Sequence, residues 1–235
     1  MYLDLKELAI NDPEIFLTEL EEYFFNVKTI DADISNYVLS STFRAFRHKD
    51  RIKGAVSESF KNSVSPIIEN FEIIIKKYGK KLNRDIYDDW HNKNVQLYKK
   101  LLNDKGVFSS TLFNSGKESY NSYAKPFNLL IWTYTFGKLK GNPNYDRQEY
   151  YFFSNIFHPA IDSDILRGIK LIISRFKETP FNIPINSTMS FLDSKDKYYL
   201  LLRYMRDLCD LYNNENTGKK ISVLAFESFW RMKNL

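Results

Sequence analysis

The sequence predicts an all-α fold, and two observations support that prediction. Apolar residues recur at spacings of three and four along most of the 235 residues, which is the pattern of helices with one buried face. No segment shows the strict apolar and polar alternation of a half-buried strand, so no sheet is predicted. Hydrophobic residues make up 43% of the chain, which is enough for these helices to enclose a sizeable core.

The first hundred residues divide into helices at local stop and start signals. Tyr78–Gly79 is a helix end, because glycine readily takes the left-handed conformation that terminates helices. The helix before it is expected to begin after Ser63 or at Ser65–Pro66, since proline favours the first helical turn. We predict one helix over residues 1–30, two within 31–79 and one over 80–104, followed by a polar loop over 105–122.

The second half contains a very apolar helix, an aromatic stretch and two C-terminal helices. The apolar helix is expected to start at about Ala124 or Pro126 and to end near Phe136. It is hydrophobic on most sides, which indicates a central position. The remaining predictions are an aromatic core segment over 150–157, a helix from 162 to about 176, a connector over 177–191, and helices over 194–212 and 222–232.

Composition and charge limit the kinds of function. The net charge of +5 and the pI of about 9 permit a phosphate-bearing partner. Cys209 is the single cysteine and the three histidines are scattered, so we expect no disulfide framework, no metal and no cofactor. No run of eighteen apolar residues is present, and residues 1–7 lack the pattern of a secretory signal. We therefore expect a cytoplasmic protein with no membrane partner.

Two residues between 122 and 170 are the best catalytic candidates. Lys125 is expected at the head of the apolar helix, where partial desolvation would favour the neutral, nucleophilic amine. Asp162, in Ile-Asp-Ser-Asp, is expected to cap the helix that follows it. Both positions also suit ordinary structural roles, so their chemistry depends on the surrounding pattern.

That pattern resembles a known enzyme superfamily. The segment Pro-Ala-Ile-Asp-Ser-Asp-Ile-Leu-Arg, residues 159–167, is similar to the aspartate-bearing segment of helix-hairpin-helix DNA glycosylases. The order of lysine, apolar helix, aromatic connector and aspartate is most similar to the archaeal 8-oxoguanine glycosylase branch, which has a degenerate hairpin and no iron–sulfur cluster. The resemblance implies a helical fold with a central cleft, a catalytic Asp162 and a nucleophilic Lys125. Its implied partner is duplex DNA with a flipped base, bound by a monomer.

The chain departs from that superfamily at the hairpin. The usual Gly-x-Gly-x-Lys is absent, because residues 119–125 contain no glycine. Lys117, in Ser-Gly-Lys, is therefore a second candidate for the nucleophile and for a DNA contact. Arg167 and Lys170, on the helix after Asp162, are predicted phosphate contacts.

The domain prediction is a single all-helical unit of residues 1–235, with a central lobe over about 31–160 and a second lobe from 1–30 plus 161–235. Two other functions are open at this point. One is a helical DNA-binding or phage-defence protein without catalytic activity, which the missing hairpin glycines favour. The other is a ribonuclease similar to HEPN domains, which would use Arg84 and His91.

Overall fold

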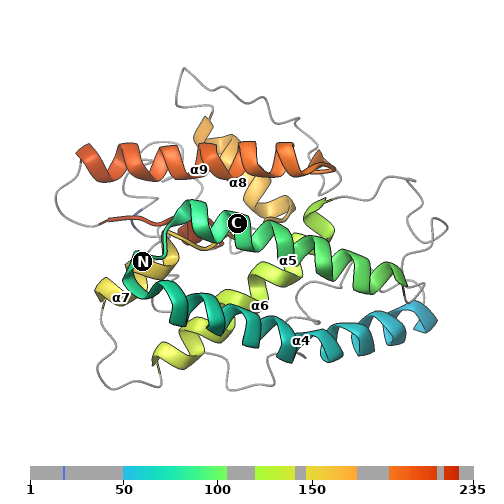
Figure 1. Cartoon of the computed structure of the whole chain (residues 1–235). Helices are drawn as coiled ribbons and strands as arrows, with labels where there is room; N and C mark the ends of the chain where they lie inside the picture. Colours follow the sequence, from blue (N-terminus) through green and yellow to red (C-terminus); the bar gives the residue numbers. More distant parts are fainter. Residues whose placement is uncertain are drawn as a thin grey trace. The chain divides into compact units, whose positions relative to one another are not determined.

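The computed structural model describes Thr18 and residues 50–104, 120–140, 147–173, 191–215 and 220–227 (Figure 1). In these residues the secondary structure is helical and contains no strand. The all-α prediction is therefore confirmed for the part of the chain that is described.

The chain divides into two compact units. Unit 1 consists of Met1–Lys28, Ser119–Asn121 and Arg147–Leu235, and unit 2 of Thr29–Glu118 and Ser122–Asp146. Both units are therefore assembled from segments distant in sequence. The central lobe predicted over about 31–160 includes residues 119–121 and 147–160, which belong to unit 1.

Unit 2 is built on a helical hairpin. Helix α4 (Asp50–Tyr78) and helix α5 (Arg84–Asp104) are joined by the short 3-10 helix η2 (Gly79–Lys81), and most of α6 (Tyr120–Lys140) belongs to the same unit (Figure 1). Trp90 of α5 is buried and packs against both α4 and α6. Its ring centroid lies 5.4 Å from those of Phe71 and Phe127, and its Nε1–H donates to Asn70 Oδ1 at 3.2 Å. Burial of these aromatic rings stabilises this unit.

The turn between α4 and α5 has a defined backbone. Gly79 takes a positive φ of 51°, the conformation expected of a glycine that ends a helix. The N–H of buried Leu82 donates to Gly79 O at 3.1 Å, and Asn83 Oδ1 accepts from the N–H of Ile86 at 3.0 Å and so caps α5. The predicted helix end at Tyr78–Gly79 is confirmed.

Two predicted helix starts are wrong. Helix α4 begins at Asp50 and runs through Pro66, because the proline lies on the exposed face, where the loss of one backbone hydrogen bond is tolerated. Helix α6 begins at Tyr120, before the predicted start at Ala124 or Pro126. Its first N–H groups, of Tyr120 and Asn121, donate to carbonyl groups of residues 193 and 192 at 3.2 and 3.3 Å. No local capping residue is therefore needed.

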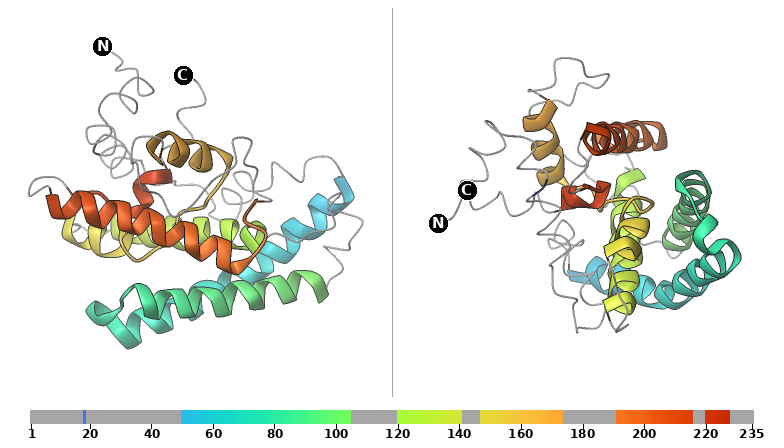
Figure 2. Two further views of the ribbon diagram at one scale, coloured as in Figure 1. Left: turned by 90° about the horizontal axis from the view of Figure 1, so that it is seen from above. Right: turned by 90° about the vertical axis from the view of Figure 1, so that its left-hand side faces the viewer.

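Unit 1 contains α7 (Arg147–Ser154), α8 (Ser163–Ile173) and α9 (Lys195–Glu215), seen in Figure 2 from two further directions. The predicted helix over 194–212 is confirmed, and Ser194 Oγ accepts from Lys197 N–H at 3.3 Å at its start. In the predicted helix over 222–232, the described part is a 3-10 turn over residues 223–227. The core is formed by side chains from α8, α9, the 3-10 turn and the segment after α7: Phe157, Ile165, Leu166, Ile169, Leu201, Leu202, Met205, Leu224 and Phe226.

Candidate functional site

Asp162 lies at the N-terminal end of α8 and caps that helix. Its Oδ1 accepts hydrogen bonds from the N–H groups of Asp164 at 2.9 Å and Ile165 at 3.0 Å. Its carbonyl oxygen accepts the first helical bond, from Leu166 N–H at 3.0 Å. These bonds satisfy N–H groups that have no partner inside the helix. The predicted cap is confirmed, and it holds the carboxylate at the positive end of the helix dipole.

The backbone before Asp162 is held by side chains from distant parts of unit 1. Residues 157–161 are all buried. Asn121 Nδ2 donates to Ile161 O at 2.8 Å, and the Glu227 carboxylate accepts from Ala160 N–H. Asp162 therefore lies in a backbone segment that is held by hydrogen bonds both before this residue and in the helix after it.

An aromatic cluster supports the same segment. His158 Nδ1 lies 3.1 Å from Tyr198 Oη, and both side chains are fully buried. The Tyr120 ring lies 5.1 Å from that of Tyr198, and the partly exposed Tyr199 ring meets His158 edge-on at 5.7 Å. Such contacts contribute about 0.5–1.5 kcal/mol each beyond surface burial. This cluster therefore fixes His158, four residues before Asp162.

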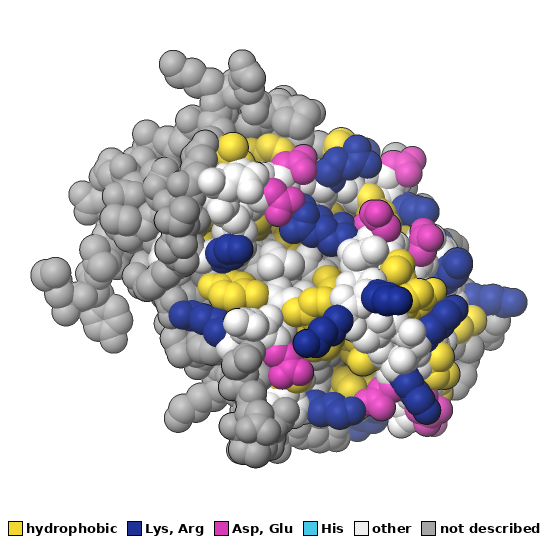
Figure 3. All heavy atoms as spheres, turned by 60° about the vertical axis from the view of Figure 1, so that its left-hand side comes forward, with side chains coloured by type: hydrophobic (Ala, Val, Ile, Leu, Met, Phe, Trp, Pro, Cys, Tyr) yellow, Lys and Arg dark blue, Asp and Glu magenta, His cyan; other side chains and the backbone are white. Residues whose placement is uncertain are grey.

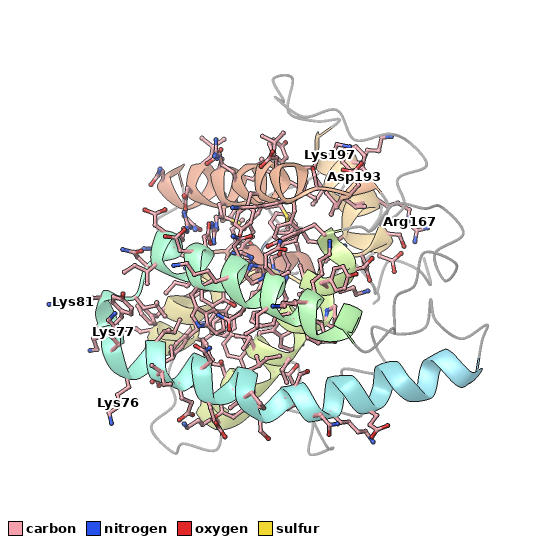
Figure 4. All side chains as sticks on the ribbon, turned by 45° about the vertical axis from the view of Figure 1, so that its right-hand side comes forward. Lys76, Lys77, Lys81, Arg167, Asp193 and Lys197 are labelled. Atoms are coloured by element: carbon pink, nitrogen blue, oxygen red, sulfur yellow. The ribbon has the colours of Figure 1, made fainter. Side chains whose placement is uncertain are left out.

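The two basic residues predicted on α8 have different surroundings. Arg167, labelled in Figure 4, forms an ion pair with Asp164 and donates from Nε to Ser163 O at 3.2 Å. Its side chain is still 58% exposed, so it remains accessible to a phosphate. The Nζ of Lys170 is buried and has no hydrogen-bond partner among the described residues. Lys170 would have to turn outward before it could contact a phosphate.

Lys125 lies inside α6, and the prediction that it begins that helix is wrong. The helix starts five residues earlier, at Tyr120, and continues through Pro126 to Lys140. The Lys125 side chain is partly buried, between buried Ala124 and buried Pro126 in the sequence. Lys125 belongs to unit 2 and Asp162 to unit 1. Their action as a catalytic pair therefore stays a prediction.

Several predicted features lie outside the described residues. They include Lys117, which was the second candidate nucleophile, and the loop of residues 105–119 that contains it. Their predicted roles stay predictions.

His91 occupies a packed interior position in unit 2. Its side chain is fully buried, and its Nε2 lies 2.6 Å from Asn128 Oδ1. Its ring contacts Phe127 edge-on at 5.3 Å and Tyr87 at 6.0 Å. A ribonuclease histidine has to reach its substrate, and this burial instead favours a structural role for His91.

Sequence reasoning missed the two residues that hold the Asp162 segment, Asn121 and Glu227. Glu227 lies in the C-terminal stretch Phe-Glu-Ser-Phe-Trp, where a lone carboxylate among aromatic residues was the available signal. Asn121 lies in a polar run with no feature that separates it from its neighbours. Its bond to Ile161 spans forty residues, and a pattern of local spacings does not contain that information.

Within the described residues, no group of three or more His, Cys, Asp or Glu side chains is arranged to hold a metal ion. None of the described helices is both long enough and apolar enough to cross a membrane. Comparisons of this chain with protein-family models, curated proteins and solved structures give no match.

Proposed function

We propose that this chain is a DNA glycosylase in which Asp162 is the catalytic carboxylate. The observation that carries the proposal is the position of Asp162: an N-cap aspartate whose preceding backbone is buried and bonded to Asn121 and Glu227. A catalytic carboxylate has to be held within a fraction of an ångström of its working position, and supporting bonds of this kind provide that. The segment Pro-Ala-Ile-Asp-Ser, similar to that of the helix-hairpin-helix glycosylases, adds support from the sequence. The proposal includes their fold and its central cleft.

The proposed chemistry begins with a base rotated out of the duplex, because its sugar C1′ is inaccessible inside the helix. The C1′–N bond breaks and its electron pair leaves with the base, while the Asp162 carboxylate stabilises the cationic sugar. Lys125 Nζ forms the new bond to C1′ and loses a proton, which the departing base takes up. The C1′–O4′ bond of the sugar ring then breaks, the proton on the lysine nitrogen passes to O4′, and the resulting Schiff base allows the strand to be cleaved.

Arg167 and the N-terminus of α8 would bind phosphates next to the flipped nucleotide. Arg167 is exposed, and the first turn of a helix attracts anions through its N–H groups and dipole. In this proposal Asp162 faces the sugar, and α8 orients the strand that carries it.

The test is base release and borohydride trapping with duplex DNA that contains one 8-oxoguanine or one abasic site. We expect a covalent adduct with the native chain, its loss in Lys125→Ala and its retention in Lys117→Ala. Asp162→Asn should reduce base release by about 100-fold or more, since a charge that stabilises the transition state is removed. Asp193→Asn is a matched control, because it removes a carboxylate that precedes α9 and pairs with Lys197. Full base release by both Lys125→Ala and Asp162→Asn would refute the proposal.

One alternative function is also supported by a specific observation. Residues 119–125 lack the glycines of the DNA-contacting hairpin, which favours a helical DNA-binding or defence protein that has no catalytic activity. Salt-dependent duplex binding without release of 8-oxoguanine and without a borohydride-trapped adduct would select this alternative.

A further inference from the structure

We propose that four lysines, two at the end of α4 and two in the turn that follows it, bind the phosphate backbone of duplex DNA. These residues, called the basic turn below, are Lys76, Lys77, Lys80 and Lys81. All four side chains are exposed. In Figure 4, Lys76, Lys77 and Lys81 point away from the ribbon at the end of the hairpin. Four positive charges therefore lie within six residues on the surface of unit 2.

The charge of the basic turn is not neutralised. Among the described residues, no acidic side chain forms an ion pair with any of the four lysines. Other lysines do have such partners: Lys138 lies 2.5 Å from Glu72 and Lys197 lies 2.9 Å from Asp193. Figure 3 shows acidic side chains interspersed among basic ones on one face of the molecule. The basic turn thus differs from paired surface lysines of the same chain.

Stabilisation of α4 does not require this much charge. Lysines in the last turn of a helix interact favourably with its dipole, but that dipole amounts to only about half an elementary charge. The four lysines of the basic turn carry roughly eight times that charge. Lys76 and Lys77 lie in the last turn of α4, and Lys80 and Lys81 lie in η2, so the four charges come from both sides of the helix end. Each DNA strand carries one phosphate per about 3.4 Å of helix axis, so phosphates are spaced closely enough for neighbouring lysines to contact different ones.

The backbone beneath the basic turn is ordered by specific contacts. Gly79 has a positive φ and accepts the bond from Leu82 N–H, and Asn83 caps α5. Packing between Phe71 and Trp90 joins α4 to α5 near this turn. Phosphate binding would therefore need only the lysine side chains to become ordered, and a smaller ordering cost favours affinity.

The inference rests on the proposed function for the choice of duplex DNA as the partner. Its test is a fluorescence-anisotropy titration of duplex DNA at several KCl concentrations, with base release measured in parallel. The test variant is K76Q/K77Q/K80Q/K81Q. The matched control, K61Q/K93Q/K100Q/K220Q, removes four exposed lysines scattered over the two units. Exposed substitutions of this kind change stability by only about 0.5 kcal/mol, so both variants should fold.

The slope of log K against log salt should fall in magnitude by about 2 to 4 in the test variant, because each phosphate that the lysines neutralise contributes about 0.9 to it. In the control it should change by less than about 1. An unchanged slope in the test variant, or equal changes in both variants, would overturn the inference. The inference would also be overturned if the test variant bound phosphatidylcholine vesicles with about 20% phosphatidylserine more weakly than the native chain while its DNA slope stayed unchanged. The basic turn would then be a lipid site.

Base release separates this inference from the proposed function. A reduced slope in the test variant, together with no base release by the native chain, would support the basic turn and refute the glycosylase. Base release by the native chain, together with an unchanged slope in the test variant, would support the glycosylase and refute the basic turn.

Discussion

Asp162 is predicted to have a structural role that can be separated from the chemical role proposed for it. In Asp162→Ala, the N–H groups of Asp164 and Ile165 lose their shared acceptor, Oδ1. Replacement of an N-cap aspartate by alanine costs about 0.5–2 kcal/mol. We expect a decrease of about 1–2 kcal/mol in the free energy of unfolding, because α8 is anchored by buried Leu166 and Ile169 and does not shift to find a new start.

Asparagine preserves the cap. Its side-chain oxygen can accept the same two hydrogen bonds, and asparagine and aspartate are equally favoured at N-caps. The free energy of unfolding of Asp162→Asn should therefore stay within about 0.5 kcal/mol of the native value. A loss of base release in this variant then reports the missing carboxylate charge, whereas the same loss in Asp162→Ala would combine both effects.

Urea unfolding followed by circular dichroism measures the difference. With a slope of about 3 kcal/mol per molar urea, the high end for small proteins, the midpoint of Asp162→Ala should fall by about 0.3–0.7 M. Hydrogen exchange of a peptide that covers the first turn of α8 provides a local measurement, and it should become faster in the alanine variant only. Equal destabilisation by alanine and asparagine would refute the capping argument, as would a native midpoint in Asp162→Ala.

Two further predictions concern polar side chains outside the candidate site. Hydrogen bonds from Lys138, and then from Tyr134, lower the pKa of Glu72. A lowered folded-state pKa contributes stability above the unfolded value of 4.5 that is lost as the pH falls. Glu72→Gln should therefore destabilise at about pH 7, and progressively less as the pH falls below 4.5. Glu69→Gln, one turn earlier and without an ion pair among the described residues, should show no such pH-dependent destabilisation. Tyr204 has a buried hydroxyl with no partner in the described part of the chain, so Tyr204→Phe should raise the free energy of unfolding by up to about 1 kcal/mol in urea titrations.

Helix ends set by local bonds could be predicted from the sequence. The helix end at Gly79 depends on that residue's own conformation. The start of α8 depends on Asp162, which accepts hydrogen bonds from N–H groups only two and three residues later. The start of α6 could not be predicted, because residues 192 and 193 supply the carbonyl groups that receive its first N–H bonds. For the same reason, Lys125 was predicted at a helix head and is found within the helix.

The candidate site shows the same division between local and distant information. A helix cap requires only Asp162 itself, and many N-cap aspartates have no further role. Around this one, Asn121 and Glu227 bond the two preceding residues, and Arg206 Nη2 donates to Ile156 O at 3.1 Å. The buried Arg206 and Asn121 and the partly buried Glu227 come from three separate segments. Burial of polar and charged groups has a desolvation cost that capping alone does not require. A carboxylate that must meet a sugar in a fixed position does require such support, and this is why Asp162 is the residue on which the proposed chemistry depends.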